Sequence, residues 1–192
     1  MYSASVSASS GNYAVGTAGL ILSSSTADYL ELPFSITPGS NGLSFAFWFK
    51  ANSAPNGARI FEFSNTFMFD DIIDDITVII RNNILSAEVM VTNAPTVSKS
   101  NLFNSLSVND NNWRHVVWTI STSGTWLFYL NGNQADSCTG VYPSTVARNA
   151  NALGFDGIPG DPTLNGVIDE FYFFNSVLTA AQVQGLYNQK NF

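Results

Sequence analysis

The stretch Trp113–Gly132 constrains the fold more than any other, because it contains a complete β-hairpin and the start of a further strand. Its first half alternates residues between two faces, and its second half, Trp126–Leu130, is an apolar run that follows a Ser123-Gly124 turn. The pair Asn131-Gly132 readily adopts the positive φ angles of a type I′ turn, so a third antiparallel strand is expected at 134–139. Aromatic and branched residues occupy both faces of the hairpin. It is therefore expected to lie inside a two-layer stack.

Similar strand patterns recur along the chain and are separated by Gly, Asn and Pro turns. The clearest is Leu43–Lys50, in which Phe45, Phe47 and Phe49 share one face. Further strands are expected at 20–22, 29–32, 59–63, 84–92, 152–155 and 167–174, with one weak strand inside 93–112. Two more are expected within 67–80, separated by a turn at the acidic pairs. This series of short strands predicts an all-β antiparallel sandwich or barrel.

The two ends of the chain differ from this pattern. Residues 1–19 are rich in Ser, Ala and Gly, which indicates a loose lead-in with a short edge strand. A short helix is expected after the last strand, where Thr179 and Gln182 have the spacing of a capping box. No second core or linker interrupts the chain, so 1–192 is expected to form a single domain. A domain of this length buries roughly 70% of its extended-chain surface, which is enough for one core.

Charge narrows the range of partners. The net charge is −7, and the seven Lys and Arg residues are scattered along the chain. Proteins that bind phosphates need clustered cations, so neither nucleic acid nor an anionic membrane is an expected partner. No apolar run approaches the ~20 residues of a membrane span, and Met1-Tyr2-Ser3 does not open a signal peptide, so no membrane insertion is expected.

Cys138 is the single cysteine, so an internal disulfide is impossible and the redox compartment stays open. A lone cysteine is more often a small buried hydrophobe than a reactive thiol. Cys138 is therefore interpreted as a packing residue.

Three groups of segments, taken together, resemble the laminin G-like domains of the concanavalin A-like lectin/glucanase superfamily. They are 27–32 with 43–50, then 113–119 with 127–132, and finally 165–175 with 178–183. The resemblance implies a jelly-roll β-sandwich of two antiparallel sheets, one concave and one convex. It also implies a module that binds sugars, proteins or surfaces, although relatives on the same fold hydrolyse glycans.

The sequence does not support catalysis. Glucanases of the superfamily carry Glu-x-Asp-x-x-Glu on one strand, which brings an acid and a nucleophile to one bond. Here the glutamates Glu31, Glu62, Glu88 and Glu170 fall on different predicted strands, and none has that spacing. His115 is the single histidine, and its place inside an apolar strand favours a packed side chain over a triad or zinc ligand.

Asp169 is the candidate metal ligand. It lies in an otherwise apolar strand, where a carboxylate is costly unless it is hydrogen-bonded or binds a metal. The resemblance implies a structural Ca²⁺ at this position, with backbone carbonyls from the N-terminal segment, such as residues 13–16, completing the ligands. The alternative is that Asp169 accepts hydrogen bonds from backbone N–H groups.

Candidate ligand-binding residues are of two kinds. Aromatic rings stack on the C–H faces of sugars, which suggests Trp126, Tyr129, Tyr142 and Tyr172, although most aromatic residues are expected in the core. The acidic loops 70–75 and 156–161, the second with Asp156 and Asp161, are the other candidates. The alternative for both loops is a solvated turn.

The sequence therefore predicts a non-enzymatic recognition module, with a glycan or a surface protein as its partner. It is expected on a secreted, cell-surface or virion protein, within a larger multidomain or oligomeric assembly. A structural or protein-interaction domain is the alternative function, and a divergent glycan hydrolase or lyase is a third.

Overall fold

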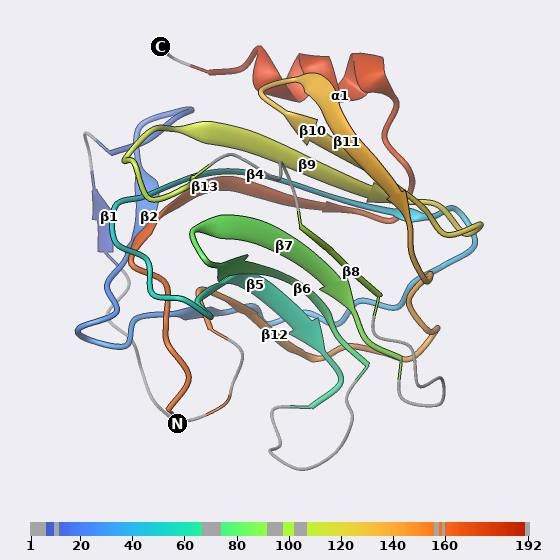
Figure 1. Cartoon of the computed structure of the whole chain (residues 1–192), viewed down its shortest axis with the longest axis horizontal. Coiled ribbons are helices and arrows are strands. Elements are labelled where there is room, and N and C mark those ends of the chain that lie inside the picture. The colour runs from blue at the N-terminus through green and yellow to red at the C-terminus, as the bar shows by residue number, and fades with distance from the viewer. Residues whose placement is uncertain are drawn as a thin grey trace.

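The computed structural model describes residues 7–9, 12–66, 74–91, 98–101, 107–155, 158 and 160–190. Two antiparallel sheets face each other, and one short helix lies outside them (Figure 1). The seven-stranded sheet has the order β1 (Ser7–Ser9), β2 (Gly19–Leu22), β13 (Gly166–Phe174), β4 (Leu43–Ala51), β9 (Arg114–Ile120), β10 (Thr125–Leu130) and β11 (Asn133–Thr139). The six-stranded sheet has the order β3 (Leu30–Glu31), β12 (Ala150–Leu153), β5 (Arg59–Ser64), β6 (Ile76–Arg81), β7 (Ile84–Val89) and β8 (Ser98–Asn101). The predicted jelly-roll sandwich is confirmed.

The hairpin forms as predicted. β9, β10 and β11 pair in succession, and the turn between the last two has φ 50° at Asn131 and 84° at Gly132. A Cβ at Gly132 would also lie within 3.0 Å of the Gln184 and Tyr187 side chains, so a larger residue would have to shift them in addition to adopting a positive φ.

One strand is displaced from its predicted position, and the weak strand is now located. β12 spans Ala150–Leu153, two residues earlier than expected, because Gly154 adopts φ 84° and donates its N–H to Ile60 O, which ends the strand. The weak strand expected inside 93–112 is β8, which pairs with β7 at the edge of the sheet.

Phenylalanine fills the space between the sheets. Phe45 of β4 stacks on Phe61 of β5 with 4.8 Å between ring centroids, and Phe47 stacks on Phe171 of β13 at 6.1 Å. Each fully buried ring of this kind contributes roughly 1.5–3 kcal/mol relative to an exposed one. The inward alternation predicted for Leu43–Lys50 therefore forms the centre of the core.

Helix α1 (Ala180–Tyr187) lies on the outer face of the seven-stranded sheet, away from the other sheet (Figure 1). Its Val183 packs with Leu178, Ala46, Val117 and Tyr129 in a second, smaller apolar cluster. Among the described residues, no helix has the length and apolar character to cross a membrane. Helix α1 thus packs on the outer face of the seven-stranded sheet. The outer face of the six-stranded sheet is polar instead.

Candidate functional site

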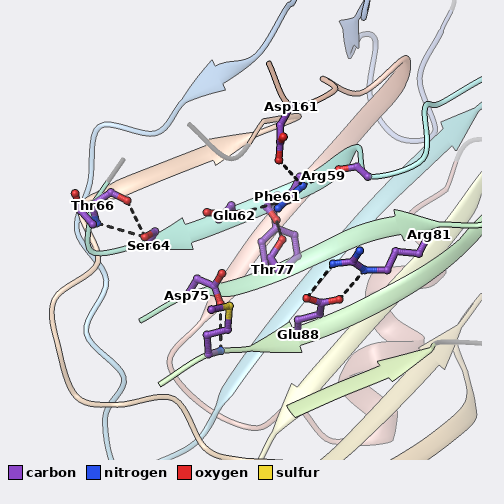
Figure 2. Close-up of polar contacts among 12 residues, drawn as sticks. Arg59, Phe61, Glu62, Ser64, Thr66, Asp75, Thr77, Arg81, Glu88 and Asp161 are labelled. Carbon is purple, nitrogen blue, oxygen red and sulfur yellow. Dashed lines mark hydrogen bonds and ion pairs between the residues drawn. The ribbon is translucent and has the colours of Figure 1, made fainter. Parts of the chain in front are cut away.

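The candidate site is the outer face of the six-stranded sheet, formed by β5, β6 and β7, and is called the polar face below. Phe61 and Val78 belong to the core between the sheets, and Glu62 and Thr77, the residues next to them, lie on the opposite side of their strands. The register places Glu62 opposite Thr77, and Thr77 opposite Glu88. Two glutamates and a threonine thus form one row across three strands (Figure 2).

Arginine side chains neutralise both glutamates of this row. Arg81 donates Nε–H to Glu88 Oε1 at 2.9 Å and a second N–H to Oε2 at 3.4 Å. Arg59 Nε lies 3.5 Å from Glu62 Oε2, and its Nη1 lies 3.4 Å from Asp161 Oδ2. The side chains of Glu62 and Glu88 are only 3% and 5% exposed, whereas those of Arg81 and Asp161 are 42% and 40% exposed. The glutamates therefore form the floor of the polar face, with Arg81 and Asp161 at its accessible margin.

Asp75 extends the row of carboxylates at the start of β6. The side chain is buried, and its Oδ1 accepts the Met90 N–H at 3.1 Å. Burial raises the pKa of Asp75 to about 7, and the nearby Glu88 adds to this rise, while the Met90 N–H, Arg59 and Arg148 oppose it. The charge of the polar face therefore changes near neutral pH.

A second polar group adjoins Asp75. The Ser144 hydroxyl donates to Asp74 Oδ1 at 2.6 Å, and the buried Arg148 donates to the carbonyls of Ser144 and Val146 at 3.0 and 3.1 Å. Burial lowers the pKa of Arg148 to about 10, so its guanidinium remains charged at pH 7. This group adds a fixed positive charge beside the carboxylates.

The polar face thus combines charged acceptors and charged donors at short range. Such a set can bind groups that both donate and accept hydrogen bonds, as hydroxyls do. No group of three metal-ligating side chains occurs within the described part of the chain. The arrangement suits hydrogen-bonded recognition.

Sequence reasoning missed this site. The sequence places Glu62 and Glu88 on separate strands and gives no reason to pair them, because sequence spacing does not show which strands become neighbours. Asp74 and Asp75 are buried, so a solvated turn is the wrong interpretation for them. One sequence signal does point to this face. Glu62 and Glu88 each stand between two apolar residues, in Phe61-Glu62-Phe63 and Ala87-Glu88-Val89, which is the alternation of a strand with one apolar and one polar side.

The four predicted aromatic residues do not form one group, although Tyr129 and Tyr172 belong to the same cluster. Trp126 is fully buried and donates its indole N–H to Val141 O at 3.1 Å, and Tyr129 is buried beneath α1. The Tyr142 hydroxyl donates to Gly39 O at 2.6 Å. Tyr172 lies with Tyr129 on the outer side of the seven-stranded sheet and donates to the Glu170 carboxylate, which raises the pKa of Tyr172 to about 12. Their role in ligand binding remains a prediction.

Of the two predicted aspartates in the second acidic loop, Asp161 lies at the margin of the polar face, as described above. Asp156 is outside the described residues, as are residues 70–73 of the first acidic loop. The ligand role of Asp161 remains a prediction, now with Arg59 as a defined neighbour.

Asp169 lies on β13, remote from the polar face. Its Oδ2 accepts the N–H groups of Ala14 and Val15 at 2.8 and 2.9 Å, and its Oδ1 accepts the Glu170 N–H at 2.9 Å. The predicted segment 13–16 does reach Asp169, but with donors, whereas Ca²⁺ needs about six to eight oxygen ligands. Calcium binding remains an untested prediction.

His115 is packed, as predicted. It is 2% exposed and lies against Trp48, with ring centroids 5.1 Å apart, and against Tyr187 of α1. Burial lowers the pKa of His115 to about 4, so the imidazole is neutral at pH 7.

One apolar pocket of about 310 Å³ lies between the sheets, away from the polar face. Its lining is mostly leucine and phenylalanine: Leu20, Leu30, Leu32, Phe34, Leu153, Ile168, Asp169, Glu170, Phe171 and Phe173. We place the candidate site on the polar face instead, because convergent donors and acceptors determine specificity.

Comparison with protein families gives a match to a model described as Laminin_G_3, concanavalin A-like lectin/glucanases superfamily, over residues 24–184. A sushi, von Willebrand factor type A, EGF and pentraxin domain-containing protein of Rattus norvegicus is 25% identical over 167 residues. That match covers 79% of this chain and 4% of the rat protein. The chain thus corresponds to a small part of that relative.

Solved structures give the same fold. The binding domain of Paraclostridial Mosquitocidal Protein 1 aligns with a TM-score of 0.69 and 14% identity, over 95% of this chain and 45% of that chain. Domain 4 of AbnA, an extracellular arabinanase of Geobacillus stearothermophilus solved with arabinotriose, also aligns with a TM-score of 0.69. Its identity is 17%, and the match covers 96% of this chain and 82% of that domain.

Proposed function

We propose a binding role for this chain, which belongs to the concanavalin A-like lectin/glucanase superfamily. In this proposal it is a non-enzymatic recognition module that binds a glycan at the polar face. One observation carries the proposal: Glu62, Thr77 and Glu88 form a row of hydrogen-bonding groups on one face, with Arg59 and Arg81 beside them.

A glycan fits this chemistry better than a hydrophobic ligand. Each sugar hydroxyl donates one hydrogen bond and accepts others, so it can connect a carboxylate to a guanidinium. Hydrogen bonds to charged groups are worth about 1.5–3 kcal/mol each. The arabinotriose complex of AbnA domain 4, which this chain matches over almost its whole length, supports a glycan as ligand.

The same geometry argues against hydrolysis by a retaining mechanism. A retaining glycosidase holds two carboxyl groups about 5–5.5 Å apart, one as acid and one as nucleophile. Here Glu62 and Glu88 are separated by the whole of β6, and each faces an arginine. Each arginine occupies carboxylate oxygens that a nucleophile would need free. The pairing therefore suits recognition better than catalysis.

The proposed setting is a surface protein. The relative from rat is many times longer than the matched region, which supports a module within a larger chain. We propose a secreted, cell-surface or virion location, with a glycan or a glycosylated surface protein as the partner.

A glycan array, followed by titration calorimetry on the best ligand, tests the proposal. Arg81→Gln removes the accessible donor of the polar face and is expected to weaken binding at least tenfold. Lys50→Gln is the matched control, because Lys50 lies over the Trp113 ring on the other sheet. Circular dichroism checks that both variants fold.

Three results would contradict the proposal. Binding to no glycan would favour a structural or protein-interaction domain. Binding that Arg81→Gln leaves intact would place the site elsewhere. Turnover of a bound polysaccharide would show an enzyme.

A further inference from the structure

His115 lies beneath the last turn of α1, in a group of three aromatic rings. Its imidazole is 5.1 Å from the ring of Trp48 and 6.0 Å from that of Tyr187, measured between centroids. The Trp48 and Tyr187 rings also stack on each other at 5.6 Å. Tyr187 belongs to the helix, whereas the other two rings stand on β4 and β9. The docked helix therefore helps to keep His115 buried.

This environment suits only the neutral form of the imidazole. Its Nδ1 has no hydrogen-bond partner among the described residues, so protonation would leave a buried N–H without an acceptor there. The flanking rings attract a cation, but this attraction is weaker than the hydration that burial removes. Burial accordingly lowers the pKa of His115 to about 4.

The charged groups around His115 do not compensate for lost hydration. Beside it on the turn after β10 is the uncharged Asn131, whose Oδ1 accepts the His115 backbone N–H at 3.0 Å. Asp169 is in the same row of the sheet, but β4 separates it from His115. The cations on the adjoining elements, Lys50 of β4 and Lys190 after α1, repel a further positive charge. An imidazolium at this position therefore needs access to water.

Helix α1 is fastened to the sheet at its N-terminal end. Ser44 of β4 donates its hydroxyl to Ser176 O at 2.8 Å and accepts the Leu178 N–H at 2.9 Å. The buried residue of the helix is Val183, in its first half, whereas Tyr187 in the last turn is partly exposed. The last turn can therefore lift from the sheet while Ser44 holds the connecting segment in place.

We propose that acid releases the last turn of α1, because His115 is protonated readily only after Tyr187 has moved away and water reaches the imidazole. The release uncovers Trp48 and His115 on the outer face of the seven-stranded sheet. Glycan binding is not involved, because the polar face belongs to the other sheet.

The size of the effect follows from proton linkage. His115 has its ordinary pKa of 6.5 when exposed, against about 4 when the helix covers it. Between these pH values the open state binds one more proton than the closed state. The equilibrium constant for opening therefore rises roughly tenfold for each pH unit of acidification. Above pH 6.5 neither state is protonated, and opening no longer depends on pH.

Amide hydrogen exchange measures the opening, because an undocked turn of so short a helix does not stay helical. Protection factors remove the intrinsic pH dependence of exchange. Those of residues 184–187 are expected to fall roughly tenfold between pH 6 and pH 5, and to stay below those of β4 at both pH values. Protection that is independent of pH, or equal to that of β4 throughout, overturns the inference.

Two variants test the cause. His115→Gln removes the titrating group and is expected to abolish the pH dependence of α1 exchange. Gly185→Ala is the matched control on the helix itself, since a Cβ there meets no atom within 4 Å and alanine favours the helix. It should raise protection by the same factor at both pH values. A pH dependence that persists in His115→Gln overturns the inference.

The wild-type imidazole provides a second measurement if His115→Gln does not fold. Its titration is followed by NMR alongside α1 exchange. A midpoint well below 6.5, with exchange of α1 increasing as the pH falls below 6.5, supports the inference. A midpoint at 6.5 while α1 stays protected shows that the docked helix does not oppose protonation, and overturns it.

Discussion

At the scale of single residues, Asp75 shows how burial changes an ordinary carboxyl group. Its pKa of about 7 lies well above the usual value near 3.9, chiefly because little water reaches it and Glu88 lies nearby. Between these two pH values the folded protein binds more protons than the unfolded chain. Its stability therefore falls as the pH rises from about 4 to about 7.

We expect Asp75→Asn to be stabilising at pH 8, by on the order of 2 kcal/mol, because the amide never ionises. At pH 4 the gain should disappear, since the wild-type carboxyl is then protonated in the folded state. Urea unfolding at both pH values measures the difference. A gain in Asp75→Asn that is the same at both pH values would contradict the argument.

At the scale of elements, α1 shows how a short helix is held in place. Thr179 Oγ1 accepts the Gln182 N–H at 3.3 Å, and Gln182 Oε1 accepts the Thr179 N–H at 2.9 Å, which is the predicted capping box. A helix of eight residues is too short to be stable alone, so it also depends on Val183 packing against the seven-stranded sheet. Capping and packing together stabilise α1 on the outer face.

Thr179→Ala is expected to destabilise the protein by about 1 kcal/mol, because it leaves N–H groups of the first turn without an acceptor. Thermal unfolding measures the loss, and amide hydrogen exchange should show faster exchange within α1 than within β4. Gln134→Ala, at an exposed position of β11, is the control. Equal exchange of α1 in the variant and the wild type would show that the cap contributes nothing.

At the scale of the whole molecule, Asp169 joins parts that lie far apart in the chain. Its carboxylate accepts N–H groups from Ala14 and Val15, which precede it by more than 150 residues. The lead-in is therefore attached to β13, beside the edge where β2 and β1 complete the seven-stranded sheet. The Asp169 side chain therefore connects the N-terminal segment to the sandwich through hydrogen bonds.

Asp169→Asn should cost about 1–3 kcal/mol in the presence of a chelator, because buried N–H groups lose a charged acceptor. Calcium binding at Asp169 leads to a separate prediction. Millimolar calcium should raise the melting temperature of the wild type but not that of Asp169→Asn. Scanning calorimetry with calcium and with chelator separates the two effects. A wild-type melt that is unchanged by chelator would contradict calcium binding.

The sequence by itself determined the features that depend on near neighbours. Alternation within Leu43–Lys50 predicts which residues face the core, and the Asn131-Gly132 pair predicts the hairpin, because a strand and a turn are each specified over a few residues. The capping box at Thr179 is local for the same reason.

Only the tertiary structure decided which side chains meet. Glu62 and Glu88 share one row because β6 pairs with both β5 and β7 in a register that includes a bulge between Arg59 and Phe61. Strand order and register are set by packing across the whole sandwich, over distances that no local pattern records. The alternation of the strands could therefore be predicted from the sequence, whereas the polar face could not.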